Sequence, residues 1–148
     1  MPVHFSEIER VLKAFGISAT FHDYFYSVDN NNRREIVNVI ATYRDIVRRY
    51  VGSKYLYEYF DCDDFAWVFK AVCSLHKVAC GFCKGTHMAG TRSGGHAFNV
   101  YPWRLGDGMI LLLVEPEILP VSWMGFTVME GNPVAFGSRR YYVRHCIF

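Results

Sequence analysis

The sequence lacks a long apolar run. No stretch of about 18 apolar residues occurs, which is the length of a membrane-spanning helix. The most apolar stretch, Met109–Val114, is only as long as a strand. The segment Met1–Glu9 also lacks a charged part followed by an apolar part, the pattern of a secretory signal peptide. We therefore expect no membrane partner and an intracellular, cytoplasmic location.

The sequence also lacks an excess of positive or negative charge. The net charge is +2 with neutral histidines, and the lysines and arginines are scattered along the chain. No basic run alternates with aromatic residues, which argues against a nucleic-acid partner. Apolar side chains are abundant instead, because 51% of the 148 residues are hydrophobic. A chain of this size and composition can bury one core, so we expect a single domain over residues 1–148.

The cysteines do not suggest a disulfide framework. There are five, an odd number, and most lie among apolar residues. The simplest interpretation is a set of free thiols in a reducing compartment.

Helical patterns occupy the first half of the chain and strand patterns the second. Ser6 is the expected N-cap of the first helix, and Asn-rich residues 29–32 mark a turn. The tight turn Gly106-Asp107-Gly108 predicts an antiparallel hairpin. The expected helices cover about residues 6–15, 36–50 and 62–76, and the expected strands are Lys77–Lys84, His96–Trp103, Met109–Glu115 and Tyr141–Ile147. The predicted fold class is α+β, with N-terminal helices packed on a C-terminal antiparallel sheet.

Three short segments, Asp61–Ala66, Gly94–Asn99 and Val114–Glu117, carry the chemistry. Cys62 lies at the N-terminus of the third predicted helix, where the helix dipole favours a thiolate. His96 lies on a strand, and Glu115 ends the next strand. A thiol, an imidazole and a carboxylate can form an activated nucleophile, in which the base takes the thiol proton and the acid orients the base.

The predicted hairpin places these groups near one another. Residues 101–103 should lie beside 110–112, so Glu115 should fall near residues 97–99, within reach of His96. Asn99 is a competing partner for the imidazole, but its odd offset from His96 puts it on the opposite strand face. The structural alternative for Cys62 is a buried, unreactive thiol.

The sequence also contains two candidate metal sites. A zinc site would be an alternative to the catalytic interpretation, and a calcium site would add to it. His76, Cys80, Cys83 and His87 are zinc-ligand types, but their two pairs are much closer in sequence than the usual 12 or more residues, which argues against zinc. Asp63 and Asp64, next to Asp61, could hold calcium, or could simply cap the helix. As unpaired charges they would disfavour a thiolate on Cys62.

At the same three segments the chain resembles a papain-like cysteine peptidase family that includes the C-terminal domain of the Marasmius agglutinin and short phage and viral proteins. Asp61–Ala66 resembles the nucleophile helix of that family, Gly95–Asn99 its histidine strand, and Glu115-Pro116 its acid. The resemblance implies a papain-like fold and peptide hydrolysis by a Cys-His-Glu triad. It also implies calcium near the site, with Asp63 and Asp64 as ligands.

The chain departs from that family two residues after the acid. Where the agglutinin has a glutamine that stabilises the oxyanion, this chain has Glu117. The backbone N–H of Cys62 is a further candidate donor, and Tyr57 and Tyr59 are others. We therefore expect a thiol peptidase acting on a protein or peptide substrate. The alternatives are an inactive papain-like viral or phage interaction domain and a small zinc-stabilised module.

Overall fold

The structure is a computed structural model that describes residues 3–26, 33–52 and 60–148. Within these ranges the helices are α1 (Phe5–Ala14), α2 (Arg33–Tyr50) and α3 (Cys62–Leu75). The strands there are β1 (Val3–His4), β2 (Ser18–Thr20), β3 (Phe25–Tyr26), β4 (Gly81–Ala89), β5 (Arg92–Leu105), β6 (Gly108–Val114), β7 (Phe126–Val128), β8 (Val134–Phe136) and β9 (Arg139–Ile147). The turn expected at residues 29–32 lies outside the described ranges. No described helix has both the length and the apolar character to cross a membrane.

The helices follow the predicted apolar spacing. In α2, the residues Val39, Tyr43 and Val47 are fully buried at successive turns, and the charged side chains lie between them. The start of α1 differs from the prediction, because His4 rather than Ser6 is the N-cap. Nδ1 of His4 accepts the backbone N–H of Ser6 at 3.2 Å. This side chain satisfies a donor that the first turn leaves unpaired.

The strands form one large sheet with the order β2-β9-β4-β5-β6-β7, and β8 pairs with β9. All of these pairs are antiparallel except β2 with β9, which is parallel. The predicted α+β class is therefore confirmed. The sheet is mostly antiparallel, as expected, and residues 18–20 of β2 add one parallel edge strand beside β9.

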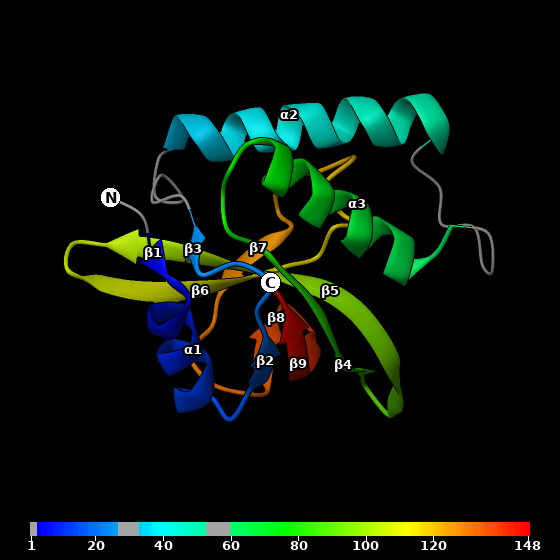
Figure 1. Cartoon of the computed structure of the whole chain (residues 1–148). Coiled ribbons are helices and arrows are strands. Elements are labelled where there is room, and N and C mark those ends of the chain that lie inside the picture. The colour runs from blue at the N-terminus through cyan, green and yellow to red at the C-terminus, as the bar shows by residue number, and fades with distance from the viewer. Residues whose placement is uncertain (1–2, 27–32, 53–59) are drawn as a thin grey trace.

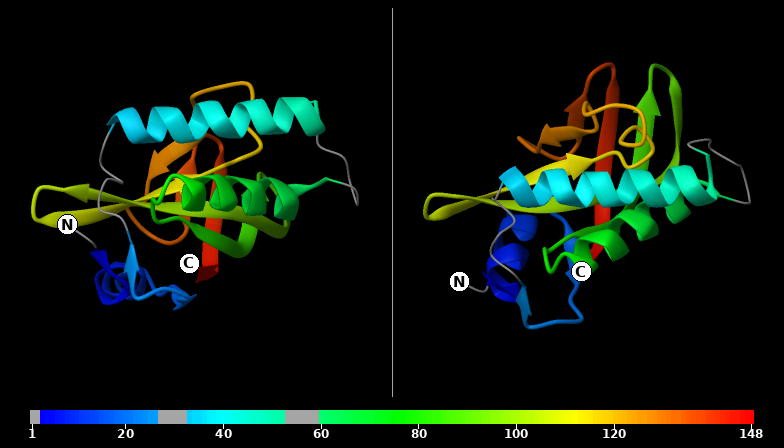
Figure 2. Two further views of the ribbon diagram at one scale, coloured as in Figure 1. Left: turned by 45° about the horizontal axis from the view of Figure 1, so that its top comes forward. Right: turned by 90° about the horizontal axis from the view of Figure 1, so that it is seen from above.

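Helices cover both faces of this sheet. Figure 1 shows α2 and α3 side by side on one face and α1 on the other, and the views in Figure 2 agree. Ile8 and Leu12 of α1 pack in one buried cluster with Val100 and Leu113. The partners of α2 and α3 include Tyr101 and other residues of the opposite strand face. Successive side chains of β5 point to opposite faces of the sheet. This strand therefore contributes to the core on each face.

The predicted hairpin is confirmed in its register. Tyr101 pairs with Leu112 and Trp103 pairs with Ile110, as the turn at Gly106–Gly108 required. Val114 pairs with Asn99, so Glu115 follows directly at the end of β6. The turn geometry therefore carries the acid to the middle of β5.

A second hairpin joins β4 to β5. Residues 84–95 belong mostly to β4 and β5, which pair from Gly81–Val100 to Ala89–Arg92. At Gly85 the pairing of β4 with β9 shifts by one residue, as in a β-bulge. A Cβ at Gly85 would lie 1.8 Å from the carbonyl oxygen of Tyr142, so only glycine permits this close approach.

Two cysteines form a disulfide across the sheet. Cys83 of β4 and Cys146 of β9 are directly paired residues with a Cα–Cα distance of 4.2 Å. The expectation of free thiols is wrong for this pair, and it holds for Cys62, Cys73 and Cys80. The two cysteines are 63 residues apart in sequence, and only the strand pairing brings them together. Disulfides are rare in cytosolic proteins, so this pair argues against the cytoplasmic location that the sequence led us to expect.

Candidate active site

Cys62 is the first residue of α3, as predicted. Asp61 is the N-cap, and its backbone N–H donates to Oδ2 of Asp64 at 3.1 Å. Phe65 and Phe69 anchor the helix in the core, whereas the Cys62 side chain stays partly exposed. The fold therefore presents this thiol at the dipole-positive end of a helix, facing outward, while Cys73 and Cys80 are buried.

His96 and Glu115 lie next to each other, as the hairpin register required. Nε2 of His96 is 2.7 Å from Oε2 of Glu115. Glu115 is only 1% exposed, and the hydroxyl of Tyr141 donates to the same oxygen at 2.9 Å. A buried carboxylate held by two such partners can fix the orientation and the tautomer of the imidazole.

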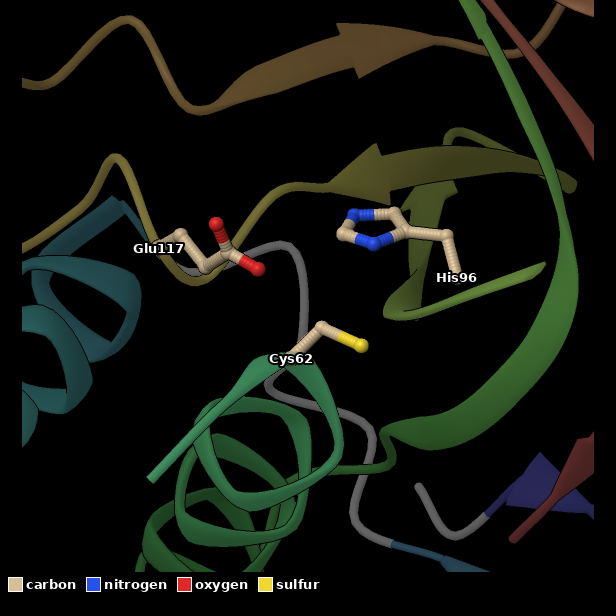
Figure 3. Close-up of side chains that lie close together, drawn as sticks. All are labelled: Cys62, His96 and Glu117. Carbon is tan, nitrogen blue, oxygen red and sulfur yellow. The ribbon is translucent and has the colours of Figure 1, made fainter. Parts of the chain in front are cut away.

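The remaining ring nitrogen of His96 faces Cys62. Figure 3 shows Nδ1 on the side of the sulfur, with Glu117 across from it. Ligand-type atoms of Cys62, His96 and Glu117 all lie within 4.8 Å of one another. Cys62 and His96 line a cavity of about 230 Å³, together with Asp63, Lys84, Gly85 and Gly95. A larger hollow of about 400 Å³ beside Lys70 contains no histidine. The smaller cavity therefore combines a thiol with an imidazole.

The surroundings of His96 favour its protonated form. Burial alone would lower its pKa, but the hydrogen bonds to Cys62 and Glu115 and the charge of Glu115 outweigh burial and raise the pKa to about 10. An imidazolium beside the sulfur stabilises a thiolate. The site thus sets a protonated imidazole beside the Cys62 sulfur, the arrangement that activates a thiol as a nucleophile.

Glu117 is the site residue whose position the sequence did not reveal. Its carboxylate points toward Cys62 and His96 (Figure 3), and its Oε1 is buried with no hydrogen-bond partner. Burial, and next the negative charge of Glu115, raise its pKa to about 7. The signal in the sequence was only its place two residues after the acid, in a turn that keeps it on the same side of the sheet.

The acidic residues around Cys62 have different surroundings. Oδ1 of Asp63 lies 3.5 Å from Sγ of Cys62, whereas Asp64 accepts the N-cap hydrogen bond. Asp61, Cys62 and Asp63 bring ligand-type atoms within 4.8 Å of one another, and Asp64 is not in this group. Calcium at Asp63 and Asp64 stays a prediction. The candidate oxyanion donors Tyr57 and Tyr59 lie outside the described residues.

Asn99 does not contact the imidazole. It is fully buried, and its Nδ2 donates to the carbonyl oxygens of Ala66 at 2.9 Å and Gly81 at 3.1 Å. This side chain thus joins the first turns of α3 to the start of β4. It holds the Cys62 helix against the strand that carries His96, which is a positioning role rather than a catalytic one.

The residues of the alternative zinc set are engaged elsewhere. His76 contacts Glu35 and Thr42, and Cys83 is in the disulfide. His87 lies beside the ring of His96, at a centroid distance of 5.3 Å. Among the described residues, His76, Cys80, Cys83 and His87 do not form a group with ligand atoms close together.

Comparison with known proteins gives matches to solved structures but none to protein families or curated sequences. No protein-family description matches the chain, and no curated protein sequence does. Among solved structures, the chain is similar to the PSL1a–E64 complex, with a TM-score of 0.66 and 20% sequence identity. The match covers 99% of this chain and 51% of that chain, so this chain spans about half the length of its structural neighbour. At this identity the similarity shows that the two share a fold.

Proposed function

We propose that this chain is a cysteine-dependent hydrolase of papain-like type that cleaves a peptide or isopeptide bond. The observation that carries the proposal is the convergence of Cys62, His96 and Glu115 from a helix and two strands. The fold similarity supports it, because E64, which accompanies PSL1a, is an inhibitor of cysteine proteases.

The reaction would proceed through a thioester. The Cys62 thiolate attacks the carbonyl carbon of the substrate, and the resulting oxyanion collapses as the C–N bond breaks. Nδ1–H of His96 gives its proton to the leaving amine. The neutral imidazole then takes a proton from water, and the hydroxide attacks the thioester. Collapse of this second oxyanion expels the Cys62 thiolate and leaves His96 protonated, so the products are a carboxylic acid and the starting form of the site.

Glu115 orients the base. It holds Nε2–H of His96, so that Nδ1 is the nitrogen that exchanges protons with sulfur, amine and water. The backbone N–H of Cys62 precedes the first helical hydrogen bond, which runs from Phe65 to Asp61. Such an unpaired N–H at a helix N-terminus can stabilise the oxyanion.

E64 and an iodoacetamide-type probe test the proposal directly. We expect each to add one mass increment to the chain, located on Cys62 by peptide mapping. Cleavage of casein should fall to the level without enzyme in Cys62→Ala, while the circular dichroism spectrum stays unchanged. Cys73→Ala is the matched control, because that thiol is buried. Labelling or cleavage that persists in Cys62→Ala would remove Cys62 from the mechanism.

A second candidate function is an interaction domain without catalysis. The observation that favours it is Glu117, since a charged carboxylate this close to the thiol would repel an oxyanion. In that case neither E64 nor the iodoacetamide-type probe would label Cys62.

A further inference from the structure

The cluster of Cys62, His96 and Glu117 offers more than a nucleophile and a base. Its three donors come from the start of α3, from β5 and from the turn after β6. Their ligand-type atoms lie within 4.8 Å of one another, and Figure 3 shows all three side chains directed at a common space. The peptidase mechanism uses two of these groups and leaves the Glu117 carboxylate without a role.

The donor types match those of a zinc ion. A tetrahedral zinc with usual bond lengths to sulfur, nitrogen and oxygen separates its ligand atoms by about 3.4–3.6 Å. Side-chain shifts of about 1 Å or less would bring the three donors to that spacing. A thiolate and an imidazole select zinc over calcium or magnesium, which prefer oxygen ligands alone. Three protein ligands would leave a fourth position open toward the cavity beside Lys84 and Gly95.

The surroundings are also those of a metal ligand set. Histidine ligands commonly donate their second N–H to a carboxylate, and here Nε2 of His96 already lies 2.7 Å from Glu115. This leaves Nδ1 as the free donor. Oε1 of Glu117 is buried without a partner, so the site contains an unsatisfied acceptor that a cation would satisfy. One thiolate and one carboxylate would balance the charge of the ion.

We propose that Cys62, His96 and Glu117 form a zinc site, and that zinc bound there blocks the thiol. Binding itself does not depend on the proposed peptidase activity, and only the inhibitory consequence rests on that function. The ion would occupy the sulfur lone pair that attacks the substrate and the Nδ1 position that transfers protons. Removal of zinc by a chelator would restore both groups.

Zinc titration of the metal-free full chain, by competition with a chromophoric chelator, tests the site. We expect one equivalent per chain. Cys62→Ser and alkylation of Cys62 should abolish binding, and Glu117→Gln should weaken it at least tenfold, since an amide is a poor zinc ligand. Glu115→Gln should weaken it by roughly 10–100-fold through the orientation of His96. His76→Ala is the matched control and should bind as the unchanged protein does.

Cobalt(II) gives a second readout that does not depend on affinity. A thiolate-to-cobalt charge-transfer band should appear in the unchanged protein and be absent in Cys62→Ser. Failure to bind zinc, or equal binding by Cys62→Ser, would overturn the site. The two proposals can fail separately. E64 labelling without zinc binding refutes the metal site alone, whereas zinc binding without labelling or cleavage supports the site and refutes the peptidase.

Discussion

Tyr141 and His96 contact the same oxygen of one buried carboxylate. The tyrosine hydroxyl is 2.9 Å and the ring nitrogen 2.7 Å from Oε2 of Glu115. The tyrosine comes from β9 and the histidine from β5, and β4 lies between these strands in the sheet. The orientation of the base therefore depends on the assembled sheet rather than on its own strand.

Glu115→Gln tests the role of this carboxylate. The amide would donate to Nε2 of His96 and so favour the wrong tautomer. We expect kcat/KM for a cleaved peptide to fall by about 10³–10⁴-fold, the scale of tautomer loss in a Ser-His-Asp triad. The pKa of His96, followed by NMR, should drop below its value of about 10. Glu130→Gln, at an exposed site, is the control. Full activity in Glu115→Gln would show that this acid does not orient the base.

Glu117 should make the stability of the protein depend on pH. Its pKa is raised from 4.5 to about 7 in the folded state. The folded chain therefore holds this proton more tightly than the unfolded chain. The resulting stabilisation is fully present below pH 4.5 and is lost as the pH rises through 7.

Glu117→Gln would remove this pH dependence. Relative to the unchanged protein, the variant should gain on the order of 1 kcal/mol in free energy of unfolding between pH 5 and pH 8, after allowance for solvent screening. Urea unfolding at several pH values measures the difference, and Glu130→Gln should run parallel to the unchanged protein. A constant difference across this range would mean that Glu117 titrates normally.

Gly85 and Gly94 provide a matched pair for testing the register shift between β4 and β9. An added methyl group at Gly85 would collide with the carbonyl oxygen of Tyr142, whereas at Gly94 nothing lies within 4 Å. We expect Gly85→Ala to lower the free energy of unfolding by about 2–4 kcal/mol, and Gly94→Ala to change it by about 0.5 kcal/mol or less. Denaturant unfolding compares them. Equal stabilities would show that the backbone at Gly85 can move aside.

The Cys83–Cys146 disulfide should stabilise the central sheet. It closes a loop over a sequence separation of 63, so its loss should cost about 2–4 kcal/mol. Thermal unfolding with and without a reductant checks this, with the variant Cys83→Ser/Cys146→Ser as a control that the reductant should not affect. An unchanged midpoint under conditions that demonstrably reduce the bond would contradict the expectation.

Local patterns in the sequence were enough to predict the α+β class and the neighbourhood of His96 and Glu115. The apolar spacing of α2 and the tight turn at Gly106–Gly108 each act over a few residues, so their consequences could be worked out without the fold. The register of one hairpin then placed the acid beside the base.

Long-range pairing could not be predicted in this way. The parallel contact of Ser18 with His145 and the disulfide of Cys83 with Cys146 join residues far apart in sequence. No local pattern marks such partners. Glu117 was considered only as a departure from a family pattern, because its burial depends on the packing of neighbouring elements.

The place of β9 in the sheet has a consequence for biosynthesis. This strand, residues 139–147, lies between β2 and β4, and its Tyr141 contacts the acid that orients the base. During translation, residues 3–138 would emerge from the ribosome before the strand that completes their sheet. A nascent chain would therefore hold its thiol without a properly oriented base, which delays reactivity until synthesis has passed residue 147.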